Sequence, residues 1–169
     1  AVVLSGQDKS GKPEIGIIAG GETSFWRTFC RGTEAGAIDF GFAVRRPSVT
    51  PDTSYLQVKS VQDMMKGKRV KAFIISPLDS RSLVRPLKDA ESQGIKSVIV
   101  GNKLKLATYL SFISIDNYAS GKLCAKKMGL LLNGSGKVVV VPFSPENDAT
   151  LQGEKGFLDE LKASWPGIT

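Results

Sequence analysis

Two aromatic residues, Phe25 and Trp26, follow a short apolar segment and offer flat surfaces on which a ligand could stack. The apolar segment covers residues 15–19, and a turn-forming stretch at residues 20–24 separates it from the pair. An aromatic face packs well against a flat partner such as a sugar ring. The alternative is that one or both rings begin a helix and pack into the core. Taken alone, the pair favours core packing.

Three apolar segments that we predict to be strands end in polar residues. Thr23 follows the first of them, Ser76 ends the third, and Asn102 follows the fourth. Ligands of open α/β sheets bind outside the carboxyl ends of the strands, so these residues should share one rim with the aromatic pair. Hydroxyl and amide groups beside an aromatic face suit a polyhydroxylated ligand. For Phe25 and Trp26, this position favours ligand contact over core packing.

Asp79 lies in the same stretch as Ser76, directly before a helical pattern. A carboxylate at such a position commonly accepts hydrogen bonds from main-chain N–H groups of a turn or a helix start. We therefore expect Asp79 to organise the loop rather than to contact a ligand.

The composition excludes several kinds of catalytic site. The chain has no histidine, which rules out histidine-based triads and histidine metal ligands. Its two cysteines, Cys30 and Cys124, have no metal-site spacing and are expected to be free, partly buried thiols. The glycine-rich segments at 16–21 and 133–137 match neither a dinucleotide fingerprint nor a phosphate loop. We predict a protein that is not an enzyme, with no catalytic residue, no metal site and no cofactor.

Charge and hydropathy limit the partners. The formal net charge is +7, but the basic clusters at 45–46, 66–69 and 126–127 are scattered, mostly at helix ends, where cations complement the helix dipole. We expect ordinary surface charge and no nucleic-acid partner. No apolar run approaches the roughly 18 residues of a membrane-spanning helix, so no direct membrane insertion is expected. The first nine residues lack the pattern of a signal peptide, as a mature exported chain would.

Apolar runs alternate with helical patterns along the chain. The predicted strands cover residues 14–19, 41–45, 71–76, 97–100, 111–115 and 137–143. Continuous apolar runs at 72–75 and 137–141 are typical of strands buried on both faces of a parallel sheet. The helical stripes are Tyr55, Val58, Val61 and Met65; Leu83, Leu87 and Ala90; Gly121, Cys124, Met128 and Leu131; and Leu151, Leu158, Leu161 and Trp165. The pattern predicts an α/β fold with a parallel sheet flanked by helices.

The alternation is interrupted once, between residues 101 and 115. There the chain passes from strand to strand with no helical pattern between them. We expect either an edge strand or a crossing into a second lobe.

These segments resemble the sugar-binding periplasmic binding proteins of ABC importers, the ribose-binding-like type I group whose fold the ligand domains of LacI-type repressors share. The resemblance covers about Pro13 to about Ala163. It is carried by Ile15–Ile18 followed by Ser24–Trp26, where the family often has Asn-Pro-Phe-Phe, and by the segments 61–65, 72–80, 115–121 and 153–157.

The resemblance implies a two-lobed clamp that closes on a sugar or polyol. Residues 1–115 would form the N-terminal lobe and residues 116–169 the first part of a second lobe, whose remainder is expected beyond Thr169. The ligand contacts it implies are Thr23, Phe25, Trp26, Ser76, Asn102, Asp116 and Asn117. It also implies a periplasmic or extracytoplasmic location and a membrane permease of an ABC importer as partner.

Two other functions stay open. One is the effector-binding domain of a LacI-type transcription regulator without its DNA-binding headpiece. The other is an enzyme of flavodoxin-like topology, against which the absent histidine and unmatched phosphate motifs count.

The chain departs from the family pattern in its charged ligand contacts. Gly101-Asn102 stands where many relatives have Asp-Arg, and Leu151-Gln152 stands where the second lobe usually supplies an arginine. A bidentate arginine clamp on hydroxyl groups is therefore missing from these positions. If a sugar binds, Phe25 and Trp26 should carry more of its recognition than the corresponding rings of relatives.

Overall fold

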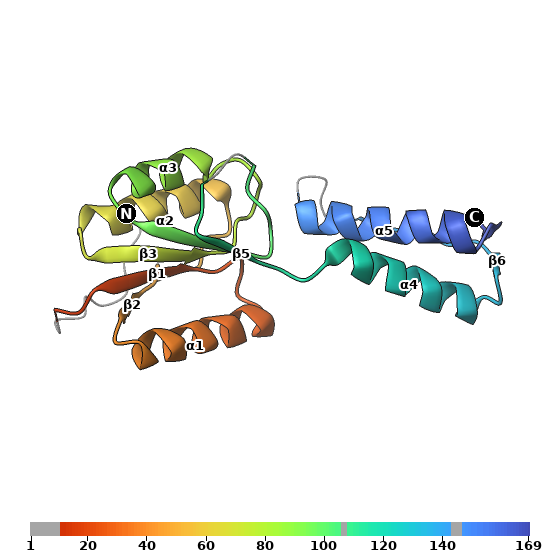
Figure 1. Cartoon of the computed structure of the whole chain (residues 1–169), viewed down its shortest axis with the longest axis horizontal. Helices are drawn as coiled ribbons and strands as arrows, with labels where there is room; N and C mark the ends of the chain where they lie inside the picture. The colour runs from red at the N-terminus through yellow and green to blue at the C-terminus, as the bar shows by residue number, and fades with distance from the viewer. Residues whose placement is uncertain (1–10, 106–107, 143–146) are drawn as a thin grey trace. The chain divides into compact units, whose positions relative to one another are not determined.

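The computed structural model describes residues 11–105, 108–142 and 147–169, and the chain divides into two compact units (Figure 1). The first unit reaches to Ile113 and the second covers Ser114–Thr169. Each unit contains hydrophobic clusters of its own. Among the described residues, no helix has both the length and the apolar character needed to cross a membrane.

A five-stranded parallel sheet, in the order β2-β1-β3-β4-β5, forms the centre of the first unit. Its strands are β1 (Glu14–Ile18), β2 (Ala43–Arg45), β3 (Val70–Ile75), β4 (Lys96–Val100) and β5 (Ser111–Ile113). The first five predicted strands agree with these bounds to within two residues. The predicted α/β class and parallel sheet are therefore confirmed.

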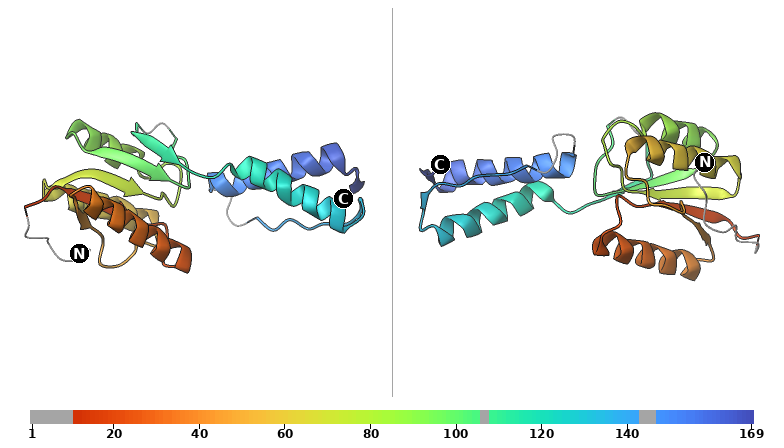
Figure 2. Two further views of the ribbon diagram at one scale, coloured as in Figure 1. Left: turned by 60° about the horizontal axis from the view of Figure 1, so that its bottom comes forward. Right: turned by 180° about the vertical axis from the view of Figure 1, so that it is seen from behind.

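Helices cover both faces of this sheet (Figure 1, Figure 2). α2 (Ser54–Lys66) and α3 (Val84–Ser92) lie on one face, and α1 (Ser24–Asp39) lies on the other. The larger core lies under α2 and α3 and contains the buried side chains of Val61, Phe73 and Leu87. The smaller core lies under α1, where Ile17 and the free thiol of Cys30 are buried.

The central strands approach closely because β1 carries a glycine opposite a large ring. Gly16 pairs with Phe73 across β1 and β3. A Cβ atom at Gly16 would lie 2.6 Å from the Phe73 ring and 3.1 Å from the sulfur of Met64. The missing side chain therefore leaves the space that Phe73 fills beneath α2.

A buried ion cluster links three strands at Glu14, which is 1% exposed. Its carboxylate lies 3.0 Å from Nε of Arg45, the last residue of β2, and 3.2 Å from Nε of Arg69, directly before β3. A lone buried carboxylate would be costly, and the two guanidinium groups offset that cost.

The apolar stripe predicted for α2 is wrong at its first residue, whereas Val58 and Met65 pack against the core. Val61 is fully buried, but Tyr55 is 74% exposed, so its assignment to the buried face was wrong. The residues that α2 buries are Gln57, Ser60, Val61 and Met64. A 3.6-residue period places these four on one side of the helix. Two of them, Gln57 and Ser60, are polar, so a hydropathy pattern does not identify them as buried.

The interruption after β4 contains the edge strand that was one of its two expected meanings. β5 is an edge strand paired with β4, and the N–H of Gly101 donates to the carbonyl of Ile113 at 2.9 Å. The second unit begins directly after β5, at Ser114.

The second unit is built from two packed helices and a short parallel strand pair. α4 (Asn117–Leu131) packs along α5 (Asp148–Ser164), and β6 (Ser135–Gly136) pairs with β7 (Gly167–Ile168). Ala125, Leu161 and Ile168 form its buried cluster. The predicted stripes here were partly wrong: Cys124, Leu131, Leu151 and Leu158 are exposed.

Small residues, not the larger apolar ones, bring α4 and α5 together. Gly121, Ala125 and Gly129 form the buried face of α4, and Gly156 is buried on α5. A Cβ atom at Gly121 would collide with the carbonyl of Gly153, and one at Gly156 with the carbonyl of Tyr118. Close backbone contact therefore leaves most leucines of both helices at the periphery, with Leu161 as the buried exception.

The strand predicted at 137–143 was also wrong over its described part. β6 ends at Gly136, and residues 137–142 form no strand, although the N–H of Val138 still donates to the carbonyl of Thr169 at 2.8 Å. β7 supplies only two residues for pairing, and Val139 and Val141 are 86% and 85% exposed. An apolar run forms a strand only where a neighbour accepts its hydrogen bonds. Phe143 lies outside the described residues.

Asp79 closes the loop between β3 and α3. Its Oδ1 accepts hydrogen bonds from the N–H groups of Arg81 and Ser82, both at 2.7 Å, and Oδ2 accepts from the hydroxyls of Ser82 and Ser54. The expected loop-organising role is confirmed. Burial alone would raise the pKa of Asp79, but these hydrogen bonds outweigh it and lower the pKa from 3.8 to about 2.

Gly156→Ala should destabilise the second unit by about 2 kcal/mol, because the added methyl group forces α4 and α5 apart. Gly153→Ala, three residues earlier on α5, is the matched control. Its Cβ would lie an ordinary 3.7 Å from the carbonyl of Asn117, and alanine is favoured over glycine in a helix by up to ~1 kcal/mol. Thermal unfolding should shift the two midpoints in opposite directions. Equal shifts would contradict the close-packing argument.

Acid should destabilise the first unit through Asp79. The pKa is about 2 in the folded chain and about 3.9 in an unfolded one, so this stabilisation is complete above about pH 5 and disappears as the pH falls toward 2. After screening by solvent we expect a loss of about 1 kcal/mol.

Urea unfolding at several pH values measures this loss of stability. Asp79→Asn should remove this part of the pH dependence, and Ser54→Ala, which deletes one donor, should reduce it. An unchanged slope in Asp79→Asn would disprove the assignment.

Candidate functional site

The carboxyl ends of β1, β3 and β4 lie side by side at one edge of the first unit's sheet. A Cβ atom at Gly20, after β1, would lie 3.0 Å from Oγ of Ser76 and 2.8 Å from Cζ2 of Trp26. A Cβ atom at Gly101, after β4, would lie 3.6 Å from the same Oγ. The structure therefore brings Trp26, Ser76 and the turn that carries Asn102 together at one rim.

The two aromatic rings have different environments at the start of α1. Phe25 is 65% exposed, and its ring meets Trp26 edge to face with centroids 4.9 Å apart. The half-buried indole of Trp26 lies against the turn at Gly20 and packs edge to face on Phe29 at 5.6 Å. Packing thus holds the indole in place, while the ring of Phe25 presents most of its surface to solvent.

Thr23 is the N-cap residue of α1 and is exposed. Its backbone is extended, with φ −66° and ψ 170°, and its carbonyl accepts a hydrogen bond from the N–H of Arg27 at 3.0 Å. Its side chain makes no capping hydrogen bond to the helix. The hydroxyl therefore lies at the same helix start as the two rings.

Ser76 is 2% exposed and continues the pairing of β3 with β1, since its N–H donates to the carbonyl of Ile18 at 2.9 Å. Its own carbonyl accepts a hydrogen bond from Nε2 of Gln57 at 2.8 Å. Oε1 of Gln57 accepts from the N–H of Leu78 at 3.0 Å. The sequence alone did not lead us to Gln57. The pattern that could have identified it is a polar residue four positions before Val61, on the buried side of α2.

Asn102 ties two strand-end loops together. Its Nδ2 donates to the carbonyl of Pro77 at 2.9 Å, and its N–H donates to the carbonyl of Val100 at 3.1 Å. The side chain is half-buried. One N–H of the amide thus holds the loop after β3 against the turn after β4.

Asp116 and Asn117 belong to the second unit, whereas the other predicted contacts belong to the first. Asp116 is the N-cap of α4, where its Oδ1 accepts from the N–H of Ala119 at 2.9 Å. Nδ2 of Asn117 lies 3.3 Å from the carbonyl of Ile115 and 3.4 Å from Oγ of Ser114. Both side chains therefore help to shape the start of α4.

A hollow of about 230 Å³ lies beside Trp26 on the α1 side of the rim. It is lined by Gly21, Glu22, Trp26, Arg27, Cys30, Arg46 and Thr50. Nη1 of Arg27 donates to the carbonyl of Glu22 at 2.9 Å, and Nε of Arg46 pairs with Glu34 at 3.0 Å. The lining of this hollow therefore combines the indole of Trp26 with side chains of both charges.

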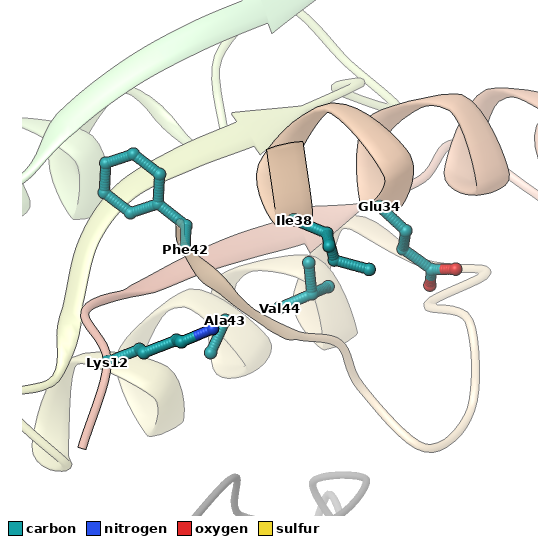
Figure 3. A pocket seen from close by; sticks show the side chains of 6 residues that line it. All are labelled: Lys12, Glu34, Ile38, Phe42, Ala43 and Val44. Carbon is teal, nitrogen blue, oxygen red and sulfur yellow. The ribbon is translucent and has the colours of Figure 1, made fainter. Parts of the chain in front are cut away.

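Two other hollows contain none of the predicted contacts. One of about 310 Å³ lies at the open edge of β2 and is lined by Lys12, Glu34, Ile38, Phe42, Ala43 and Val44 (Figure 3). The other, of about 510 Å³, lies between α2 and α3. Within the described parts of the chain, no group of three or more acidic, cysteine or histidine side chains could hold a metal ion.

A family model described as "Periplasmic binding protein domain" matches residues 15–169. A search among curated proteins found no match. Among solved structures, an ABC transporter solute-binding protein from Agrobacterium vitis, bound with alpha-D-tagatopyranose, is 31% identical with a TM-score of 0.81. That match covers 94% of this chain and 56% of the other.

Two further structures show the same fold at lower identity. A solute-binding protein from Burkholderia graminis, in complex with D-arabinose, is 23% identical with a TM-score of 0.85, covering 96% of this chain and 56% of that one. The fructose-binding periplasmic domain of a hybrid two-component system is 22% identical with a TM-score of 0.84, covering 93% and 52%. The chain thus spans little more than half the length of these three proteins. With a family model matched from β1 to its last residue, this chain belongs to the periplasmic binding protein family.

Proposed function

We propose that this protein is a solute-binding protein that captures a sugar or a sugar-like polyol. The observation that carries the proposal is the exposed ring of Phe25, held edge to face on Trp26 at the rim where β1, β3 and β4 end. The Agrobacterium vitis protein, 31% identical, is bound to a ketose in its pyranose form, which supports a ligand of this class.

Each predicted contact has a role in this proposal. The rings of Phe25 and Trp26 pack against the apolar face of the sugar, and the hydroxyl of Thr23 reaches its polar edge. Ser76 and Asn102 supply hydroxyl and amide groups from the neighbouring loops. Asp116 and Asn117 are the contacts that we propose from the second unit.

The proposal extends to delivery of the ligand to the membrane permease of an ABC importer, from a periplasmic or extracytoplasmic location. The ABC transporter membership of the Agrobacterium vitis protein supports this assignment over an effector domain of a LacI-type regulator. Recognition by stacking and hydrogen bonding needs no catalytic group or cofactor, which agrees with a protein that binds its ligand without transforming it.

Isothermal titration with D-tagatose, D-fructose and D-arabinose should detect binding of at least one sugar. Phe25→Ala and Trp26→Ala should each weaken that binding by about tenfold or more, since an aromatic contact contributes about 1.5 kcal/mol beyond its buried area. Phe40→Ala is the matched control, because Phe40 caps the opposite end of α1 and is 82% exposed. Its affinity should stay within about twofold of the unchanged protein.

Two results would contradict the proposal. If none of these sugars, and no polyol such as D-mannitol, binds the unchanged protein, the ligand class is wrong. If a sugar binds but Phe25→Ala and Phe40→Ala have equal affinities, the ligand lies elsewhere on the molecule.

A further inference from the structure

We propose that Gln57 is a positioning residue, whose buried side-chain amide sets the geometry of the loop after β3 for the ligand. This inference rests on the proposed function, because it concerns the same rim. Gln57 does not line the rim; it acts from α2 beneath it, with 1% of its surface exposed.

The amide of Gln57 takes the place of a neighbouring strand where the sheet ends. Pairing of β3 with β1 continues through the N–H of Ser76, and no further. The carbonyl of Ser76 then accepts from Nε2 of Gln57 at 2.8 Å. Pro77 has no N–H to donate. The next donor is the N–H of Leu78, which Oε1 of Gln57 accepts at 3.0 Å. One side chain thus satisfies a main-chain acceptor and a main-chain donor that are two residues apart.

Asn102 holds the residue between them. Its Nδ2 donates to the carbonyl of Pro77 at 2.9 Å. Three successive residues, from Ser76 to Leu78, are therefore each fixed by a side-chain amide. Two of these three hydrogen bonds come from Gln57.

A second contact from α2 fixes the far end of the same loop. Ser54, three residues before Gln57 and on the same side of the helix, donates its hydroxyl to Asp79. The first turn of α2 therefore holds the loop at two places, and Gln57 is the one nearest the rim.

Displacement of this loop would change the packing around the aromatic pair. Oγ of Ser76 and the indole of Trp26 both lie within 3.0 Å of the Cβ position of Gly20, so Gly20 is enclosed between them. A shift of the Ser76 backbone changes the space that Trp26 occupies against this turn. We infer that Gln57 controls affinity for the ligand without touching it.

The experiment compares Gln57→Met and Gln57→Glu with Val61→Ala. Methionine has a similar length but leaves the carbonyl of Ser76 and the N–H of Leu78 without partners. Glutamate keeps an acceptor for Leu78 but replaces the donor to Ser76 with a second, negatively charged oxygen. Val61, one turn further along α2 and fully buried, is the matched control, because its truncation lowers stability without touching the loop.

Amide hydrogen exchange is the first measurement, and it requires no ligand. Exchange at Leu78 should accelerate about tenfold more than at the amides of β3 in Gln57→Met, and should stay protected in Gln57→Glu. Val61→Ala should accelerate both sets equally. If Leu78 in Gln57→Met follows the β3 amides, Gln57 does not hold the loop and the inference is wrong.

Sugar affinity is the second measurement, made at a temperature where all variants are folded. Gln57→Met should weaken binding by about tenfold, with Val61→Ala within about twofold of the unchanged protein. Equal affinities of these two variants would overturn the positioning role and leave Gln57 a purely structural residue. If the unchanged protein binds no sugar, the proposed function fails, whereas hydrogen exchange still decides whether Gln57 holds the loop.

Discussion

The pairing of β1 with β3, buried on both faces, is the constraint on which the first unit depends. Gly16 leaves room for the ring of Phe73, so the two strands and α2 approach closely. Parallel pairing brings their carboxyl ends to one edge, and β4 follows in the same direction. The turn at Gly20, Ser76 and the turn at Asn102 therefore meet without any long loop to carry them. Residues held at the ends of rigid strands are already ordered, so engaging a partner there costs little further entropy.

The two units achieve close packing by different means. In the first, large side chains from both helix-covered faces fill the space around the sheet. In the second, Gly121 and Gly156 let the backbones of α4 and α5 touch, and Leu161 and Ile168 fill the end of the interface. Backbone contact of this kind tolerates almost no added atom, whereas a side-chain core can adjust through rotamers. The geometry of α4 against α5 is accordingly set by residues that hydropathy scales treat as neutral.

Most secondary-structure elements of the first unit could be predicted from the amino-acid sequence, and fewer of those of the second. A continuous apolar run at residues 72–75 predicted β3, the central strand of the five-stranded sheet, because burial on both faces favours such a run. The same criterion failed at residues 137–143, where the apolar run is present but the pairing partner β7 is two residues long. Helix stripes failed at Tyr55 and Cys124, since the faces that α2 and α4 bury include polar and small residues. Position along the chain predicted the rim at Trp26 and Ser76, but the contacts of Gln57 arise only from tertiary folding.

The hydrogen bonds that hold the loop from Ser76 to Leu78 all go to main-chain atoms. They do not depend on which side chain stands at position 76. A substitution there changes the side chain that packs against the turn at Gly20, while these main-chain hydrogen bonds stay in place. The path of the backbone and the side chain at position 76 are thereby separated, so this position can change without loss of the hydrogen bonds that hold the loop. Tolerance of this kind comes from the side-chain amides of Gln57 and Asn102.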